Sequence, residues 1–206
     1  MENKRLKFIL ASASPRRKEL LGFLNIPFEI MTKNIPEESH HLDPVEYSRH
    51  IAQQKGKAVF DELTYDSFVV SADTIVCLEN KIYGKPVDEQ DARKILSELS
   101  GKTHSVFTAV SLLLKFKGNT KSYSFVEESR VQFNSIGSTL LNNYLMTGDS
   151  LDKAGAYGIQ GPSLTFISKV DGDYANVVGF PLSRFILECD DFFKPFLEGQ
   201  SWQELF

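Results

Sequence analysis

Short apolar runs alternate with helical segments along the chain, and this alternation is the feature that most constrains its fold. It is typical of α/β proteins, in which helices cover a sheet. The segment SYSFVEESRVQF also alternates apolar and polar residues at period two, which indicates an antiparallel or edge strand with one wet face. We therefore expect a mixed, twisted sheet with flanking helices. The expected strands are 7–12, 28–32, 67–73, 74–80, 104–116, 121–133 and 163–172, with 176–180 as a further candidate.

Capping residues mark where several helices begin. Ser14 precedes Pro15, Asp43 precedes Pro44, and Asp88 opens the segment DEQDARKILSEL. The side chain of an N-cap residue accepts a hydrogen bond from the first helical turn, and proline suits the first helical position. The sequence predicts one helix from residue 15 onward and further helices over 44–63, 88–99, 138–147 and 182–193.

The size of the chain allows one domain or two small lobes. With 206 residues, 42% of them hydrophobic, it can bury a sizeable core. There is no internal repeat and no evident linker. We expect a single domain over 1–206, with a main lobe of about 1–84 and 136–206 and a smaller lobe of about 85–135.

Charge and composition exclude several classes of function. The net charge of −4 argues against a surface for a nucleic acid polymer, so any anion must bind a local cluster of cations. The two cysteines and four histidines match neither a zinc spacing nor a disulfide framework. No apolar run approaches ~18 residues, so we expect neither a signal peptide nor contact with a membrane. These features predict a soluble, cytoplasmic protein.

The segment SASPRR places two cations at the start of a helix. Cations there are unfavourable by about 0.3–1 kcal/mol each, because the helix dipole already presents positive charge. A bound anion would remove this conflict. Hydroxyls of Ser12 and Ser14, unpaired helix N–H groups and the guanidinium groups of Arg16 and Arg17 would together form a phosphate cradle. The alternative is that both arginines are simply solvated.

The segment SFVVSADTIV interrupts an apolar run with Asp73. A carboxylate in such a run is costly to bury unless it is paired or bound to a cation. Asp73 is therefore a candidate metal ligand or general base. The alternative is an aspartate that starts a turn between two strands.

Two lysines and an acidic loop supply further candidates. Lys85 lies in the loop YGKP, and Lys55 lies on a partly apolar stripe of the helix 44–63. Lys55 could extend along this surface to reach water, or it could serve as an interior cation for a phosphate. Glu37 and Glu38, in the loop PEESHH, are typical of solvated acids when considered locally.

The segment LDKAGAYGIQG is rich in small residues and carries Tyr157 and Gln160. A flat backbone with one ring and one amide suits the recognition of a planar ligand, although a structural turn is the alternative. A second glycine-bearing turn, GDYANVVGFPL, could pack behind it or form a subunit contact. Together with the cations and Asp73, this segment indicates a nucleotide site in which a divalent ion helps to neutralise phosphates.

Neither G-x-x-x-x-G-K-[ST] nor G-x-G-x-x-G is present, which argues against ordinary kinases, GTPases and dinucleotide-binding enzymes.

The ordered blocks LASASPRRKELL, SADTIV, YGKP, LSGKTHSVFTAV, LDKAGAYGIQG and GDYANVVGFPL resemble the Maf family of nucleoside triphosphate pyrophosphatases, also called septum formation inhibitors. The resemblance covers about residues 7–187. It implies a fold similar to that of the inosine triphosphate pyrophosphatases, with two lobes around a nucleotide cleft, often as a homodimer. DKAGAYGIQG resembles the dTTP/UTP pyrophosphatase branch in particular.

The resemblance also implies roles for single residues. Asp73 matches the proton acceptor and lies close to the metal, and Glu37 matches an acid that holds a divalent cation such as Mg²⁺ or Mn²⁺. Thr74 and Gln160 match positions associated with pyrimidine specificity. The phosphate-binding cations and their flanking residues match Arg16, Lys55 and Lys85, with Ser12 and Arg17.

The implied reaction is attack of water on the α-phosphate of dTTP, UTP or modified pyrimidine nucleotides, giving a nucleoside monophosphate and pyrophosphate. An alternative is a nucleotide-binding regulator of cell division in which hydrolysis is incidental or lost. None of the matched site residues is replaced by an inert one, which argues against lost catalysis, although a regulator could retain them all.

Overall fold

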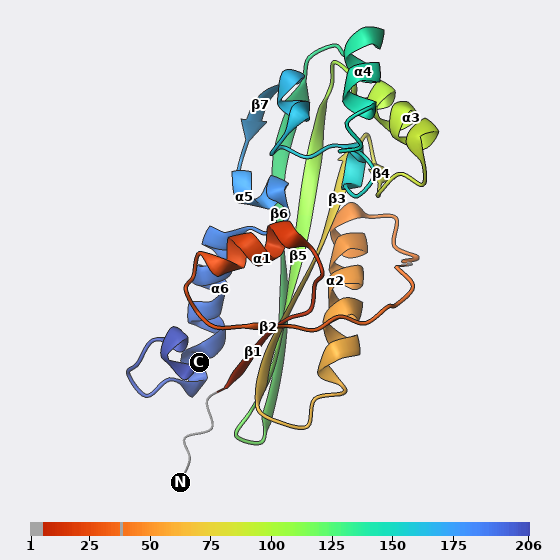
Figure 1. Ribbon diagram of the computed structural model, residues 1–206. Helices are drawn as coiled ribbons and strands as arrows, with labels where there is room; N and C mark the ends of the chain where they lie inside the picture. Colours follow the sequence, from red (N-terminus) through yellow and green to blue (C-terminus); the bar gives the residue numbers. More distant parts are fainter. Residues whose placement is uncertain (1–5, 38) are drawn as a thin grey trace.

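The computed structural model describes residues 6–37 and 39–206, which form one mixed, twisted sheet flanked by helices (Figure 1). The strand order is β2-β1-β3-β5-β6-β7, and β4 pairs with β3. β1 runs parallel to both of its neighbours, whereas all the other pairs are antiparallel. The predicted mixed α/β fold is therefore confirmed. The strands are β1 Lys7–Leu10, β2 Glu29–Ile30, β3 Ser67–Leu78, β4 Lys81–Tyr83, β5 Thr103–Phe116, β6 Asn119–Phe133 and β7 Ile167–Asp171.

The helices begin largely where the caps predict. The side chains of Ser14, Asp43 and Asp88 each accept a hydrogen bond from the first turn of α1, α2 and α3 respectively. No helix of the described residues is long and apolar enough to span a membrane. The helices are α1 Pro15–Gly22, α2 Pro44–Phe60, α3 Glu89–Leu99, α4 Ser138–Leu145, α5 Tyr174–Val178 and α6 Leu182–Phe193, with short 3₁₀ turns η1 Ala154–Ala156, η2 Pro162–Thr165, η3 Lys194–Phe196 and η4 Trp202–Leu205.

Three predictions of strands are wrong. The runs 67–73 and 74–80 form the single strand β3, because β5 pairs with it through Asp73 and Thr74 without interruption. The segment 163–172 begins as the turn η2 and becomes a strand only at Ile167. The candidate strand 176–180 does not form: residues 176–178 belong to α5, because the Asp173 side chain caps this helix, and Gly179 ends it at a φ of +125°.

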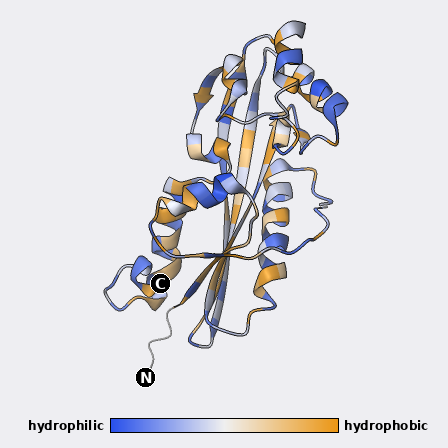
Figure 2. Ribbon diagram, in the orientation of Figure 1, coloured by the Kyte–Doolittle hydropathy of each residue, from blue (hydrophilic) through white to orange (hydrophobic). Residues whose placement is uncertain are grey.

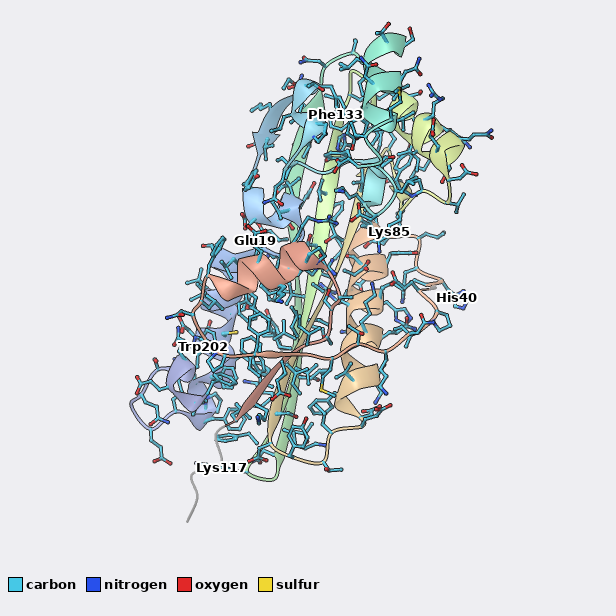
Figure 3. All side chains as sticks on the ribbon, in the orientation of Figure 1. Glu19, His40, Lys85, Lys117, Phe133 and Trp202 are labelled. Carbon is cyan, nitrogen blue, oxygen red and sulfur yellow. The ribbon has the colours of Figure 1, made fainter. Side chains whose placement is uncertain are left out.

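The two largest hydrophobic clusters of the described residues lie along the sheet, as the hydropathy colouring indicates (Figure 2). The larger cluster surrounds β1, α1, α6 and the C-terminal segment, and it includes the fully buried Trp202. The second packs α3, α4 and the segment 154–166 around Phe133 (Figure 3). β5 and β6 contribute to both clusters. The lobe boundaries near residues 85 and 135 stay a prediction.

α2 lies very close to β3, on the face of the sheet opposite α1 and α6 (Figure 1). The Ser71 hydroxyl donates to the Ala52 carbonyl at 2.6 Å. A Cβ atom added at Gly56 would lie 2.6 Å from the same hydroxyl oxygen, so a residue without a side chain is needed there. This close approach brings the side chains of α2 within reach of those of β3.

Candidate active site

A cleft of about 610 Å³ opens beside an unpaired stretch of the β3 edge. β1 pairs with β3 only as far as Val70, and β4 joins only at Val76, so neither of these neighbours covers the edge between them. Ligands of α/β sheets commonly bind where parallel strands end, as β1 does here. The structure places every predicted site residue along this cleft. These residues are Ser12, Ser14, Arg16, Arg17, Glu37, Lys55, Asp73, Thr74, Lys85 and Gln160.

Asp73 and Lys55 form an ion pair in the floor of the cleft. Lys55 Nζ lies 2.7 Å from Asp73 Oδ1 and 2.9 Å from Glu37 Oε2. The side chains of Lys55 and Asp73 are only 18% and 10% exposed. Lys55 is therefore an interior cation, and Asp73 does not start a turn. Glu38 lies outside the described residues.

Arg17 is anchored by three hydrogen bonds within the protein. Its Nε donates to the Gly179 carbonyl at 2.9 Å, and its terminal nitrogens donate to the hydroxyls of Ser12 and Thr74 at 3.2 and 3.0 Å. Burial lowers the pKa of Arg17 from its usual value, whereas the charge of Asp73 acts in the opposite direction. Arg17 thus fastens the start of α1 to β3 and to the end of α5, and it is not a solvated cation.

Ser14 also serves the helix itself. Its hydroxyl accepts from the Arg17 backbone N–H at 3.5 Å, while Ser12 Oγ accepts from the Ser14 N–H at 3.3 Å. These contacts shape the turn before α1. The predicted role of the two serines in a phosphate cradle stays a prediction.

Arg16 and Lys85 differ from Arg17 because neither is fastened to the core. One terminal nitrogen of Arg16 lies 3.1 Å from Asp152 Oδ2. Lys85 is exposed above α2, and no carboxylate of residues 6–37 or 39–206 lies within 4.0 Å of its ammonium group (Figure 3). Both cations are therefore available to an anion that enters the cleft.

Thr74 lies on the opposite face of β3 from Asp73. Its hydroxyl is 3.0 Å from that of Thr108, which in turn donates to the Asn176 carbonyl at 3.0 Å. Gln160 lines the cleft and is exposed to solvent. Thr74 is thus held rigidly, whereas the Gln160 amide is open to a ligand.

The loop around Tyr157 is both a structural turn and a wall of the cleft. The Tyr157 hydroxyl lies 2.7 Å from Nε2 of His104, a residue only 2% exposed. Burial lowers the pKa of His104 to about 4 and raises the pKa of Tyr157, so both side chains are neutral near pH 7. Gly155 lets this loop approach β3, because an added Cβ atom would lie 2.7 Å from Val76 Cγ2.

Sequence reasoning missed the charged residues at the start of this loop. Lys153 Nζ lies 3.0 Å from Asp149 Oδ1 and 2.6 Å from Asp152 Oδ1, and all three residues line the cleft. The segment LDKAGAYGIQG contains Asp152 and Lys153, but its small residues, its ring and its amide are the features that predict contact with a ligand. The useful signal was an acid directly beside a lysine in a glycine-rich loop.

Two carboxylates, Glu37 and Asp73, could hold a divalent cation at the cleft. Both already contact the same cation, Lys55, so they lie close enough to share a ligand. In the part of the chain that the structure describes, no group of three or more His, Cys, Asp or Glu residues could hold a metal. This donor set fits Mg²⁺, which commonly binds one or two carboxylates and takes its other ligands from substrate phosphates and water.

Comparison with known proteins identifies the family. The model described as Maf-like protein matches residues 7–191. The chain belongs to the Maf-like protein family. It is 42% identical over 187 residues to a protein named dTTP/UTP pyrophosphatase from Bacillus cytotoxicus, covering 90% of this chain and 95% of that one. A Geobacillus protein of the same name is 43% identical over 183 residues, covering 88% and 96%.

Solved structures give more distant matches to this Maf-like chain. A dITP/XTP pyrophosphatase from Mycobacterium abscessus is 10% identical, with a TM-score of 0.46 over 95% of this chain and all of that one. A HAM1 protein from Coxiella burnetii is 15% identical, with a TM-score of 0.43 over 87% and 96%. At these scores the likeness carries no argument about the site.

Proposed function

We propose that this Maf-like chain hydrolyses dTTP and UTP to the nucleoside monophosphate and pyrophosphate. The observation that carries the proposal is the buried carboxylate of Asp73, held 2.7 Å from Lys55 on the floor of a cleft that Arg16 and Lys85 also line. A carboxylate positioned beside several cations suits the attack of water on a phosphate. The choice of dTTP and UTP as substrates rests on the relatives, which are named dTTP/UTP pyrophosphatase.

Asp73 would act as the general base. An oxygen of its carboxylate accepts a proton from water, and the water oxygen forms a bond to the α-phosphorus as the bond to the bridging oxygen of the leaving pyrophosphate breaks. The ion pair with Lys55 and the rigid strand hold the carboxylate in one orientation. A positioned base of this kind is worth about 10²–10⁴-fold in rate.

The cations of the cleft would stabilise the charge that gathers on pyrophosphate as it leaves. Lys55, Lys85 and Arg16 enter from three separate segments of the chain, so they can surround a triphosphate. A divalent cation held by Glu37 and Asp73 would neutralise phosphate oxygens when it is bound. The requirement for such a metal is part of this proposal.

Base selection would depend on Gln160. Its amide can pair with the polar edge of a pyrimidine, and a wrong base would leave that amide without a partner. Thr74 would act indirectly, without contacting the base, because its hydroxyl already forms hydrogen bonds with Arg17 and Thr108. Modified pyrimidine nucleotides are included among the proposed substrates. A cytoplasmic location and a homodimer stay predictions.

Release of pyrophosphate from a panel of nucleoside triphosphates, with Mg²⁺ or Mn²⁺, tests the proposal. We expect release from dTTP and UTP, little from purine nucleotides, and a loss of about 10²–10⁴-fold in Asp73→Asn. Preference for a purine would overturn the substrate assignment. If the protein binds nucleotides and cleaves none, the nucleotide-binding regulator becomes the better account.

A further inference from the structure

Arg16 is paired across the cleft with an acid from another wall. The bond between its terminal nitrogen and Asp152 Oδ2 joins the first turn of α1 to the start of the loop that carries Tyr157 and Gln160. The two residues are 136 positions apart in the chain. Their side chains are 25% and 60% exposed and both residues line the cleft, so the pair lies on its solvent-facing side.

The two neighbouring arginines are held in different ways. Arg17 uses a nitrogen for each of three neutral oxygen acceptors, which an entering anion cannot displace without disrupting α1. Arg16 instead has one charged partner, Asp152, whose side chain is 60% exposed. An exposed pair of this kind is weak, commonly worth no more than about five-fold in an equilibrium constant. A phosphate can therefore take the place of Asp152.

Asp152 would not be left without a partner by this exchange. Lys153 Nζ lies 2.6 Å from its other carboxylate oxygen, and Lys153 is itself held by Asp149. Burial acts to raise the pKa of Asp152, but hydrogen bonds from Lys153 and Arg16 outweigh it and hold that pKa below its usual value. The acid is thus charged and ready to recover Arg16 whenever the cleft empties.

We propose that Asp152 competes with phosphate groups for Arg16 and so weakens the binding of the reaction products. This inference rests on the proposed function. An anion that takes the terminal nitrogen of Arg16 now paired with Asp152 must first displace the carboxylate. A triphosphate keeps its other contacts with the cleft, whereas pyrophosphate or a monophosphate has fewer of them and loses a larger share of its binding. Asp152 would therefore help the products to leave.

Titration calorimetry with inorganic pyrophosphate and with UMP, with and without Mg²⁺, tests this competition. In Asp152→Asn we expect both dissociation constants to fall by about two- to five-fold. Asp152→Glu keeps the charge and should stay near wild type. In the Arg16→Gln background, where there is no guanidinium group to compete for, Asp152→Asn should change neither constant.

Glu19→Gln is the matched control for net charge. Glu19 is exposed on α1, one turn beyond Arg16, and its neutralisation should leave both constants unchanged (Figure 3). An equal gain in Glu19→Gln, or a gain in Asp152→Asn that persists without Arg16, would overturn the inference in favour of general repulsion. Unchanged affinity in Asp152→Asn would also overturn it while hydrolysis by the wild type still supports the proposed function. If wild type and Arg16→Gln bind pyrophosphate equally, the phosphate cradle itself is wrong.

Discussion

Replacement of His104 should make the stability of this protein less sensitive to acid. His104 is 2% exposed, its Nδ1 has no hydrogen-bond partner among the described residues, and burial lowers its pKa to about 4. In the unfolded chain a histidine has a pKa of about 6.5. Because the unfolded state binds the proton more tightly, the free energy of unfolding falls as the pH drops from about 6.5 towards 4.

The size of the effect follows from these two pKa values. At pH 5 the unfolded histidine is protonated and the folded one is largely neutral, and each pH unit below 6.5 costs about 1.4 kcal/mol. His104 should therefore remove about 2 kcal/mol of stability between pH 7.5 and pH 5. His104→Gln cannot titrate, so this share of the loss should vanish in the variant, whatever stability it loses at pH 7.5.

Urea unfolding of both proteins at pH 7.5 and pH 5 measures the difference. The contributions of all other titratable groups to the loss of stability are common to the two proteins. They cancel when the loss in one protein is subtracted from the loss in the other. His41→Gln, at an exposed position, should keep the loss seen in wild type. The reasoning is refuted if His104→Gln loses as much stability as wild type over this pH range.

Two further predictions concern α2. Lys55→Met should lower kcat/KM for UTP by about 10²–10³-fold, because it removes one preorganised donor from the cleft. Lys57→Met, on the exposed face of α2, should leave kcat/KM unchanged, and steady-state kinetics of both variants tests this difference. Gly56→Ala should destabilise the protein by about 1–3 kcal/mol, because the new Cβ atom would lie 2.6 Å from Ser71 Oγ. Gly22→Ala, with no atom within 4 Å, should cost nothing in urea unfolding, and equal effects of the two substitutions would contradict the close approach of α2.

The parts of the fold that depend on neighbouring residues could be predicted from the sequence. The side chains of Ser14, Asp43 and Asp88 act on N–H groups three residues away, so each helix start was visible locally. The continuity of β3 through Asp73 was not, because β5 imposes it from residues far along the chain. The segment 176–180 contains two valines and a phenylalanine, which favour a strand, but the cap at Asp173 makes its first three residues helical and Gly179 ends the helix.

In the candidate site, too, features set by neighbouring residues could be predicted, whereas those set by distant segments could not. Arg16, Arg17 and Asp73 stood out because each violates a local rule, and the structure brings all three to one cleft. Which partner satisfies each could not be deduced. The acid that meets Arg16 and the carbonyl of Gly179 that meets Arg17 come from distant segments. Local rules therefore identified the residue types of the site but not how the two arginines divide their roles.

Asp73 and Thr74 join the two sides of the cleft because successive strand residues point to opposite faces. Asp73 contacts Lys55 of α2 on one face, and Thr74 accepts from Arg17 of α1 on the other. Both side chains reach the cleft only because β1 and β4 leave the edge of β3 free at this point. A slip of one residue in the pairing with β5 would exchange the two faces, placing the Thr74 hydroxyl on the side of Lys55 and the Asp73 carboxylate on the side of Arg17. The uninterrupted register between β3 and β5, which the sequence did not reveal, is thus what assigns the carboxylate to Lys55 and the hydroxyl to Arg17.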